Sequence, residues 1–148
     1  MRGIIGDTGE VLRVVLDTSV LVAAWRSSLG ASFELVHAIG GGAFEIAVSV
    51  SLVAEYESAL LRHLSGRQRA RHVHDLIDHV CAVAVQQKIF FLWRPLLPDP
   101  NDDMVVEVAM ASQSAAIVTH NLRHFAAAER LGLSVLAPGA FLNQLLKR

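Results

Sequence analysis

Short runs of apolar, often β-branched residues alternate along the chain with longer stretches in which apolar residues recur every three or four positions. The short runs predict strands and the longer stretches predict helices. The expected strands are Val11–Leu16, Phe44–Val48, Ile89–Leu92, Ala116–Thr119 and Ser134–Leu136. They show little polar alternation, which is typical of strands that helices cover on both faces. The pattern therefore predicts an α/β fold with a mostly parallel sheet.

Glycine, proline and capping residues mark the ends of the expected helices. Ser51 and Asn101 are predicted N-caps, and Gly132 follows the last residue of another helix. The predicted helices are Val20–Ser27, Ser32–Ile39, Leu52–Leu64, Arg67–Gln87, Asp102–Gln113, Leu122–Leu131 and Ala140–Lys147. Because no linker or repeat interrupts this pattern, we expect an N-terminal extension, residues 1–10, and a single domain, residues 11–148.

The composition excludes several classes of protein. Of the 148 residues, 53% are hydrophobic and 18% are charged, so the chain is not disordered. Its apolar runs are far shorter than the ~20 residues of a membrane-spanning helix, and the first ten residues contain no apolar signal sequence, so we expect a cytoplasmic protein. A single cysteine, Cys81, excludes disulfides and a cysteine metal site, and its apolar neighbours predict a buried, inert thiol. A net charge of −1 excludes nucleic-acid binding by bulk charge.

With so few charged residues, the positions of the carboxylates are informative. Asp17 comes directly after the first predicted strand, and Thr119 and Asn121 close the fourth. In open parallel sheets, ligands bind beyond the carboxyl ends of the strands. Each of these residues also suits a simple capping role, which remains the alternative.

Asp102 begins a predicted helix and shares one face with the apolar residues three, four and seven positions later, Val105, Val106 and Ala109. That face should pack on the sheet, so Asp102 is expected at the rim of the core. Asp103 falls about 100° away, near Glu107, on a face that we expect to be more hydrated. The alternative interpretation is that Asp99, Asp102 and Asp103 only supply favourable charge at a helix N-terminus.

Four residues from four separate segments are thus candidates to lie close together in the fold: Asp17, Glu55, Asp102 and Asn121. Glu55 alone is also compatible with a surface position, since helical periodicity does not separate it from Glu57. Clustered carboxylates repel one another, and one takes up a proton unless a cation is present. Oxygen ligands without a cysteine or histidine pattern favour Mg²⁺ or Mn²⁺.

Four strings in this order resemble the PIN-domain nucleases, most closely the VapC-like toxins of toxin–antitoxin modules. They are VVLDTSVLVAA at 14–24, SLVAEYESALL at 51–61, PDPNDDMVVEVA at 98–109 and IVTHNLRHF at 117–125. The final VLAPGAFLNQLL at 135–146 is similar to the last strand and helix of that family. The resemblance implies a three-layer α/β/α sandwich and a Mg²⁺- or Mn²⁺-dependent ribonuclease.

The resemblance also assigns roles to single residues. Asp17, Glu55 and Asp102 match the first three acidic positions, at which the metal and the chemistry are expected. Asn121 stands at the fourth, which is often Asp in the family, so a second metal is in doubt. Two nearby acids, Asp99 and Asp103, are candidates to restore the charge, and two hydroxyl residues, Ser19 and Thr119, are candidates to support the site.

Two rival functions remain: a PIN-fold nucleic-acid-binding module with weak or lost activity, which Asn121 suggests, and a structure-specific DNA nuclease. For contacts to RNA phosphates, the candidates are Arg67, Arg69 and Arg71, and a solvated helix face is the alternative. The chain has a high share of apolar residues, which predicts a homodimer interface or a groove for an antitoxin helix. The candidate residues for this surface are Trp25, Leu29, Phe33 and the helix at 67–87.

Overall fold

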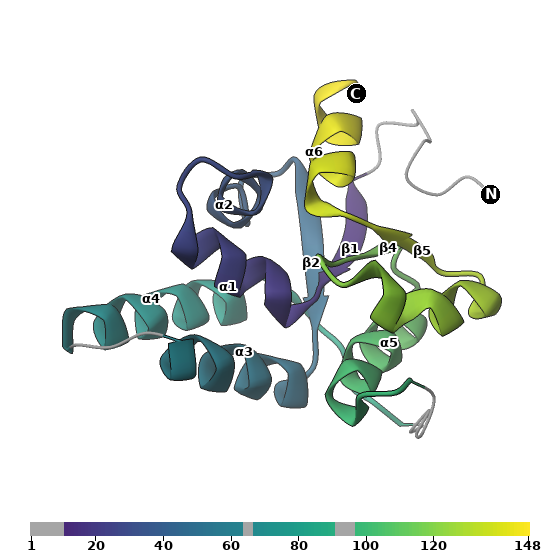
Figure 1. Cartoon of the computed structure of the whole chain (residues 1–148), viewed down its shortest axis with the longest axis horizontal. Coiled ribbons are helices and arrows are strands. Elements are labelled where there is room, and N and C mark those ends of the chain that lie inside the picture. Colours follow the sequence, from purple (N-terminus) through teal and green to yellow (C-terminus); the bar gives the residue numbers. More distant parts are fainter. Residues whose placement is uncertain (1–10, 64–66, 91–96) are drawn as a thin grey trace.

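The computed structural model describes residues 11–63, 67–90 and 97–148 (Figure 1). Within these residues, five strands form one parallel sheet in the order β3-β2-β1-β4-β5. The strands are β1 (Leu12–Leu16), β2 (Phe44–Val48), β3 (Val85–Gln86), β4 (Ala116–Val118) and β5 (Ser134–Leu136). The predicted α/β fold with a mainly parallel sheet of about five strands is confirmed.

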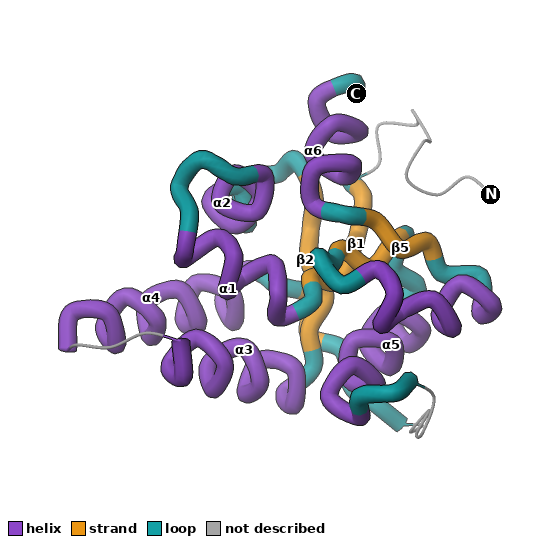
Figure 2. Tube along the Cα trace, viewed as in Figure 1, coloured by secondary structure: helices purple, strands orange, loops and turns teal. Residues whose placement is uncertain are grey.

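Helices cover both faces of this sheet and make a three-layer sandwich (Figures 1 and 2). The helices are α1 (Thr18–Arg26), α2 (Ala31–His37), α3 (Val50–His63), α4 (Arg67–Val83), α5 (Pro100–Ser112), α6 (Pro138–Leu146) and the 3₁₀ helix η2 (Leu122–Leu131). Helices α1 and α2 lie on one side of the sheet, and α5 and η2 lie on the other. The central strand β1 is consequently buried on both faces, with Val14, Val15 and Leu16 all at 0% exposure. This double coverage explains why the strands lack polar alternation.

The third strand is the main error of the sequence prediction. The strand that pairs with the outer side of β2 is the two-residue strand Val85–Gln86, which the prediction had assigned to the end of a helix. Ile89 and Phe90 form no strand, and the rest of the predicted strand, residues 91–92, lies outside the described residues. Helix α4 therefore ends at Val83 rather than at Gln87.

The prediction that Cys81 is buried is wrong. One face of helix α4 packs against the core, and the buried residues on that face are Val73, Ile77 and Val80. Cys81 follows the last of these by one residue, about 100° around the helix, and is exposed.

The expectation of a hydrated face on α5 is also wrong. Asp103 has 0% exposure and Glu107 only 3%, because α5 packs against β1, β2, β4, α3 and η2 rather than against one surface. Oδ1 of Asp103 accepts a hydrogen bond of 2.9 Å from the Leu97 amide. The N-cap of α5 is Asp99 rather than the predicted Asn101, since the side chain of Asp99 accepts from the Asn101 amide.

The order of the strands places a crevice between β1 and β4. The chain leaves β1 toward β2 on one side and leaves β4 toward β5 on the other. Such a reversal opens a crevice beyond the carboxyl ends of the two strands, which is the usual ligand site of open α/β sheets. Among the described helices, none is both long and apolar enough to cross a membrane.

Candidate active site

Asp17 lies at this crevice, where β1 ends and α1 begins. Its backbone amide continues the sheet by donating to the carbonyl of Val118 in β4. It occupies the N-cap position of α1, but its side chain makes no capping hydrogen bond. The residue is only 4% exposed. The carboxylate is therefore held for something other than capping the helix.

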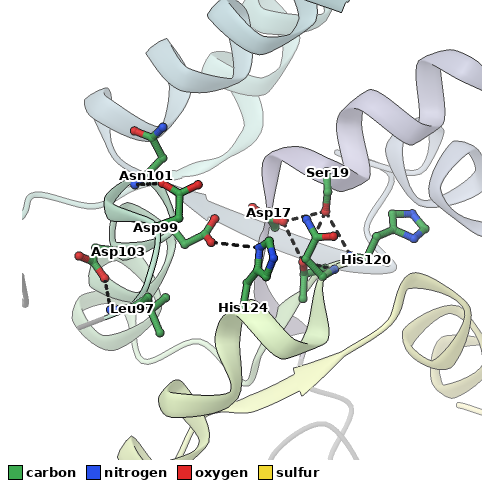
Figure 3. Close-up of polar contacts among 11 residues, drawn as sticks. Asp17, Ser19, Leu97, Asp99, Asn101, Asp103, His120 and His124 are labelled. Atoms are coloured by element: carbon green, nitrogen blue, oxygen red, sulfur yellow. Dashed lines mark hydrogen bonds and ion pairs between the residues drawn. The ribbon is translucent and has the colours of Figure 1, made fainter. Parts of the chain in front are cut away.

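Two hydroxyl groups fix one oxygen of this carboxylate. Ser19 Oγ donates to Oδ2 of Asp17 at 2.7 Å, and Thr119 Oγ1 donates to the same atom at 2.8 Å. Each hydroxyl accepts a backbone amide in turn, from His120 and from Asn121 respectively. The chain of bonds sets the direction of each hydroxyl and joins the ends of β1 and β4 (Figure 3). Ser19 and Thr119, the two hydroxyl residues named from the sequence, thus both contact Asp17, and their role in the chemistry of the site stays a prediction.

Asp102 brings a second carboxylate to the crevice from the first turn of α5. Its side chain is 13% exposed, and Oδ2 is buried without a hydrogen-bond partner. Nδ1 of His124 lies 3.5 Å from that oxygen, which is long for a hydrogen bond and is an ion pair only when the ring is protonated. Burial, followed by repulsion from Asp17 and Asp99, raises the pKa of Asp102 from 3.8 to about 6. The helical periodicity had preferred Asp102 to Asp103 for this position, and it is Asp102 that lines the crevice.

Glu55 reaches the same place from α3, and its neighbour Tyr56 anchors that helix. The Tyr56 hydroxyl donates to the carbonyl of Leu16, the residue before Asp17. Tyr56 has 0% exposure, and this burial, together with the charge of Asp17, raises the pKa of its hydroxyl well above the usual value. Oε1 of Glu55 accepts from Nη2 of Arg62 at 3.3 Å. The Tyr56 bond, which the sequence gave no reason to expect, ties α3 to the end of β1 next to Asp17.

A cavity of about 680 Å³ joins these groups. The carboxylates that line it are Asp17, Glu55, Asp99 and Asp102. Asn121 lines it as well, so all four residues predicted to converge do reach one cavity. Asp103 does not line it, and its carboxylate turns toward Leu97 instead (Figure 3).

The basic residues that line the cavity differ from the arginines that were candidates for contacts to RNA phosphates. Arg69 and Arg71 are exposed on α4 and do not line the cavity, and the side chain of Arg67 lies outside the described residues. The basic side chains that do line it are Arg26, Arg62, His63, His120 and His124. Arg26 was missed because no other basic residue precedes it in its segment. His124 was given no role although it follows His120 and Arg123, and only the fold brings Arg26 and His124 to one cavity.

The donor set fits a hard divalent cation. Asp17 and Asp102 line the cavity, and among the described residues the buried Oδ2 of Asp102 has no hydrogen-bond donor and only the His124 ring nearby, at 3.5 Å. A buried carboxylate oxygen of this kind is costly unless a cation compensates its charge. Within the described ranges, no three His, Cys, Asp or Glu side chains form a complete ligand set by themselves. Magnesium usually keeps several water ligands and takes only one or two carboxylates from the protein. Two carboxylates and water are therefore an appropriate set for this ion.

Comparisons with known proteins agree with this fold. A family model described as a PIN domain matches residues 13–123. No curated protein matches the chain. The solved structure of VapBC2 from Rickettsia felis, bound to a DNA fragment from their promoter, has a chain with a TM-score of 0.57 and 16% identity, over 85% of this chain and 98% of that one. A chain of FitAB bound to an IR36 DNA fragment gives a TM-score of 0.56 and 14% identity, over 84% and 94% of the two chains.

Proposed function

The chain belongs to the PIN-domain family, and on that premise we propose that it is a divalent-metal-dependent endoribonuclease, the toxin of a toxin–antitoxin pair. The proposal rests on one observation above all. Asp102 keeps a buried carboxylate oxygen without a hydrogen-bond partner in the cavity that Asp17 also lines. Such an arrangement is costly for the folded protein unless a cation occupies the crevice.

In the proposed mechanism, Asp17 and Asp102 are the residues that would hold one Mg²⁺ or Mn²⁺. When bound, the ion supplies Lewis-acid chemistry: it neutralises charge on the phosphodiester and makes water a stronger nucleophile. Ser19 and Thr119 keep Asp17 in one orientation, because both hydroxyls donate to its Oδ2. Glu55 orients the attacking water and accepts its proton.

Asn121 gives this site one negative charge less than four acids would supply. Asp99 also lines the cavity and is the described residue that can add charge there, whereas Asp103 is committed to the Leu97 amide. We therefore propose a single tightly held ion. A binding module with lost activity and a DNA nuclease remain the competing functions, and the same experiment decides among all three.

The test is cleavage of end-labelled RNA and DNA, side by side, with Mg²⁺, with Mn²⁺ and with a chelator. We expect metal-dependent cleavage of RNA that Asp17→Asn abolishes. The Asn side-chain oxygen still accepts from Ser19 and Thr119, so the variant should keep its fold, checked by circular dichroism. Asp78→Asn removes an equal charge from the exposed face of α4 and is the matched control.

Three results would reject the proposal. Full metal-dependent activity in Asp17→Asn would remove the assigned site. Cleavage of DNA but not of RNA would favour the DNA nuclease. Binding of RNA without cleavage under any metal condition would favour the binding module.

A second cavity supports the proposed antitoxin partner. It measures about 620 Å³ and lies between α1, α2 and α4, with the apolar residues Trp25, Phe33, Val36 and Leu76 in its wall. An apolar groove between helices suits the apolar face of an amphipathic helix. Leu29, which is 93% exposed, lies outside this groove. We propose that a helix of the antitoxin binds there; a second copy of the chain is the competing occupant.

A further inference from the structure

The cavity that contains the four carboxylates has a positively charged end. Arg26 is the last residue of α1, and Arg62 and His63 are the last two residues of α3. All three line the cavity together with Asp17 and Glu55, which stand at or near the beginnings of the same two helices. Helices α1 and α3 pack side by side and run outward in the same direction (Figure 1). The cavity therefore changes from acidic to basic along the two helices.

Arg26 differs from two arginines that the structure shows in ion pairs with carboxylates. Arg13 pairs with Glu45, and Arg62 pairs with Glu55. Arg26, in the part of the chain that the structure describes, forms no ion pair, although four carboxylates line the same cavity. The guanidinium of Arg26 is permanently charged, so it is available to bind an anion.

Its one side-chain hydrogen bond holds this group in place. Nη2 of Arg26 lies 2.9 Å from Nδ1 of His63. A guanidinium can only donate, so Nδ1 accepts and the ring proton of His63 sits on Nε2. The bond therefore fixes the Arg26 fork without neutralising it and leaves the Nε2–H of His63 as a further donor.

The length of α1 determines which anion Arg26 can meet. Arg26 follows Asp17 by nine residues, and a helix rises ~1.5 Å per residue, which puts the two Cα atoms about 13 Å apart. An anion bound at Arg26 is therefore different from a phosphodiester held at Asp17 and Asp102. A polymer with regularly repeated phosphates can occupy both ends of the cavity at once.

We propose that Arg26, positioned by His63, binds a backbone phosphate of the nucleic-acid substrate that lies away from the bond being cut. This inference rests on the proposed nuclease function and assigns the substrate path within it: the strand runs from the Asp17–Asp102 end of the cavity along α1 and α3. Guanidinium groups suit phosphate oxygens because their planar forks form paired, charge-assisted hydrogen bonds.

The test is binding of a single-stranded RNA in the presence of a chelator, so that no cleavage is needed. Arg26→Gln should weaken binding roughly tenfold. It should also lower the slope of log affinity against log salt by about 0.7, the value expected for one phosphate contact on a single strand. Arg130→Gln is the matched control, because Arg130 is also an exposed arginine in the last turn of a helix but lies outside the cavity. We expect Arg130→Gln to bind as the parent does.

Cleavage kinetics supply a second readout. With a long RNA, Arg26→Gln should raise KM more than it lowers kcat, since the contact is remote from the reacting bond. With a dinucleotide that contains a single phosphodiester, the loss should be much smaller. His63→Leu should show part of the Arg26→Gln defect, and His63→Asn, which restores an acceptor, should recover most of the loss.

The inference is overturned if Arg26→Gln and Arg130→Gln change the salt slope equally, or if the loss is the same on the dinucleotide and on the long RNA. A loss that follows a fall in Tm would show that Arg26 only stabilises the end of α1. These results differ from failure of the proposed function, in which the parent protein cleaves no RNA with any metal.

Discussion

Replacing Asp102 by Asn should make the metal-free protein more stable while it abolishes activity. The carboxylate is largely buried, and Oδ2 has no hydrogen-bond partner. Its neighbours Asp17 and Asp99 are also acidic, and among the described residues His124 is the one that offers a compensating charge. At neutral pH the folded protein therefore contains a buried negative charge on Asp102 that would have a lower free energy in water.

The raised pKa gives the size of the effect. A change of one in pKa corresponds to about 1.36 kcal/mol, so the change from 3.8 to about 6 corresponds to about 3 kcal/mol at neutral pH. Asn removes the charge but adds donors that also need partners, so we expect a net gain of about 1–3 kcal/mol. For a domain of this size, such a gain raises Tm by roughly 3–10 °C.

The sign of the pH dependence follows from the same shift. Because the folded-state pKa of Asp102 is raised, the folded protein binds this proton more tightly than the unfolded chain does. The contribution of Asp102 to stability is therefore fully present below pH 3.8 and is lost as the pH rises through about 6. The gain in stability of Asp102→Asn over the parent should be absent near pH 3.8 and complete above about pH 6.

Urea unfolding at a series of pH values, with and without Mg²⁺, measures this effect. Mg²⁺ should stabilise the parent protein, because it binds the folded state only, and should not stabilise Asp102→Asn. Asp78→Asn, on the exposed face of α4, should show neither effect. If Asp102→Asn destabilises the protein at neutral pH, or if its effect does not change with pH, the reasoning about this carboxylate is wrong.

Two further predictions concern the framework of the site and the groove. Tyr56→Phe removes the donor to the Leu16 carbonyl, so urea unfolding should show a free energy of unfolding lower by about 1–3 kcal/mol. Cleavage should also weaken, because Glu55 moves relative to Asp17. An unchanged unfolding midpoint would contradict this prediction. Trp25→Ala should weaken binding of the proposed antitoxin, measured by calorimetry, without slowing RNA cleavage. Equal binding by the parent and the variant would exclude the groove as the antitoxin site.

The sequence predicted the sheet well wherever a strand is long enough to have a pattern of its own. Strands β2 and β5 match their predicted ranges, and β1 and β4 differ by one residue, because β-branched runs under two layers of helices read as continuous apolar segments. Strand β3 has only two residues, Val85 and Gln86, directly after an amphipathic helix. Its pairing with β2, rather than any local preference, makes it a strand.

Convergence of the carboxylates could be anticipated because parallel strands end at one edge of a sheet. The positions of Asp17 and Asp102 followed from that rule and from the helical face that Asp102 shares with Val106. The burial of Asp103 could not be anticipated, because it depends on α5 packing against five other elements. The same holds for Arg26 and His63, 37 residues apart in the sequence, whose contact arises only when α1 packs on α3.

Anomalous diffraction from crystals soaked in Mn²⁺ tests the central claim most directly. We predict one strong peak within ligand distance of both Asp17 and Asp102, which is absent from Asp17→Asn crystals soaked in the same way. A peak bound elsewhere, or no peak at a Mn²⁺ concentration that supports cleavage, would contradict the assignment of this cavity as the metal centre.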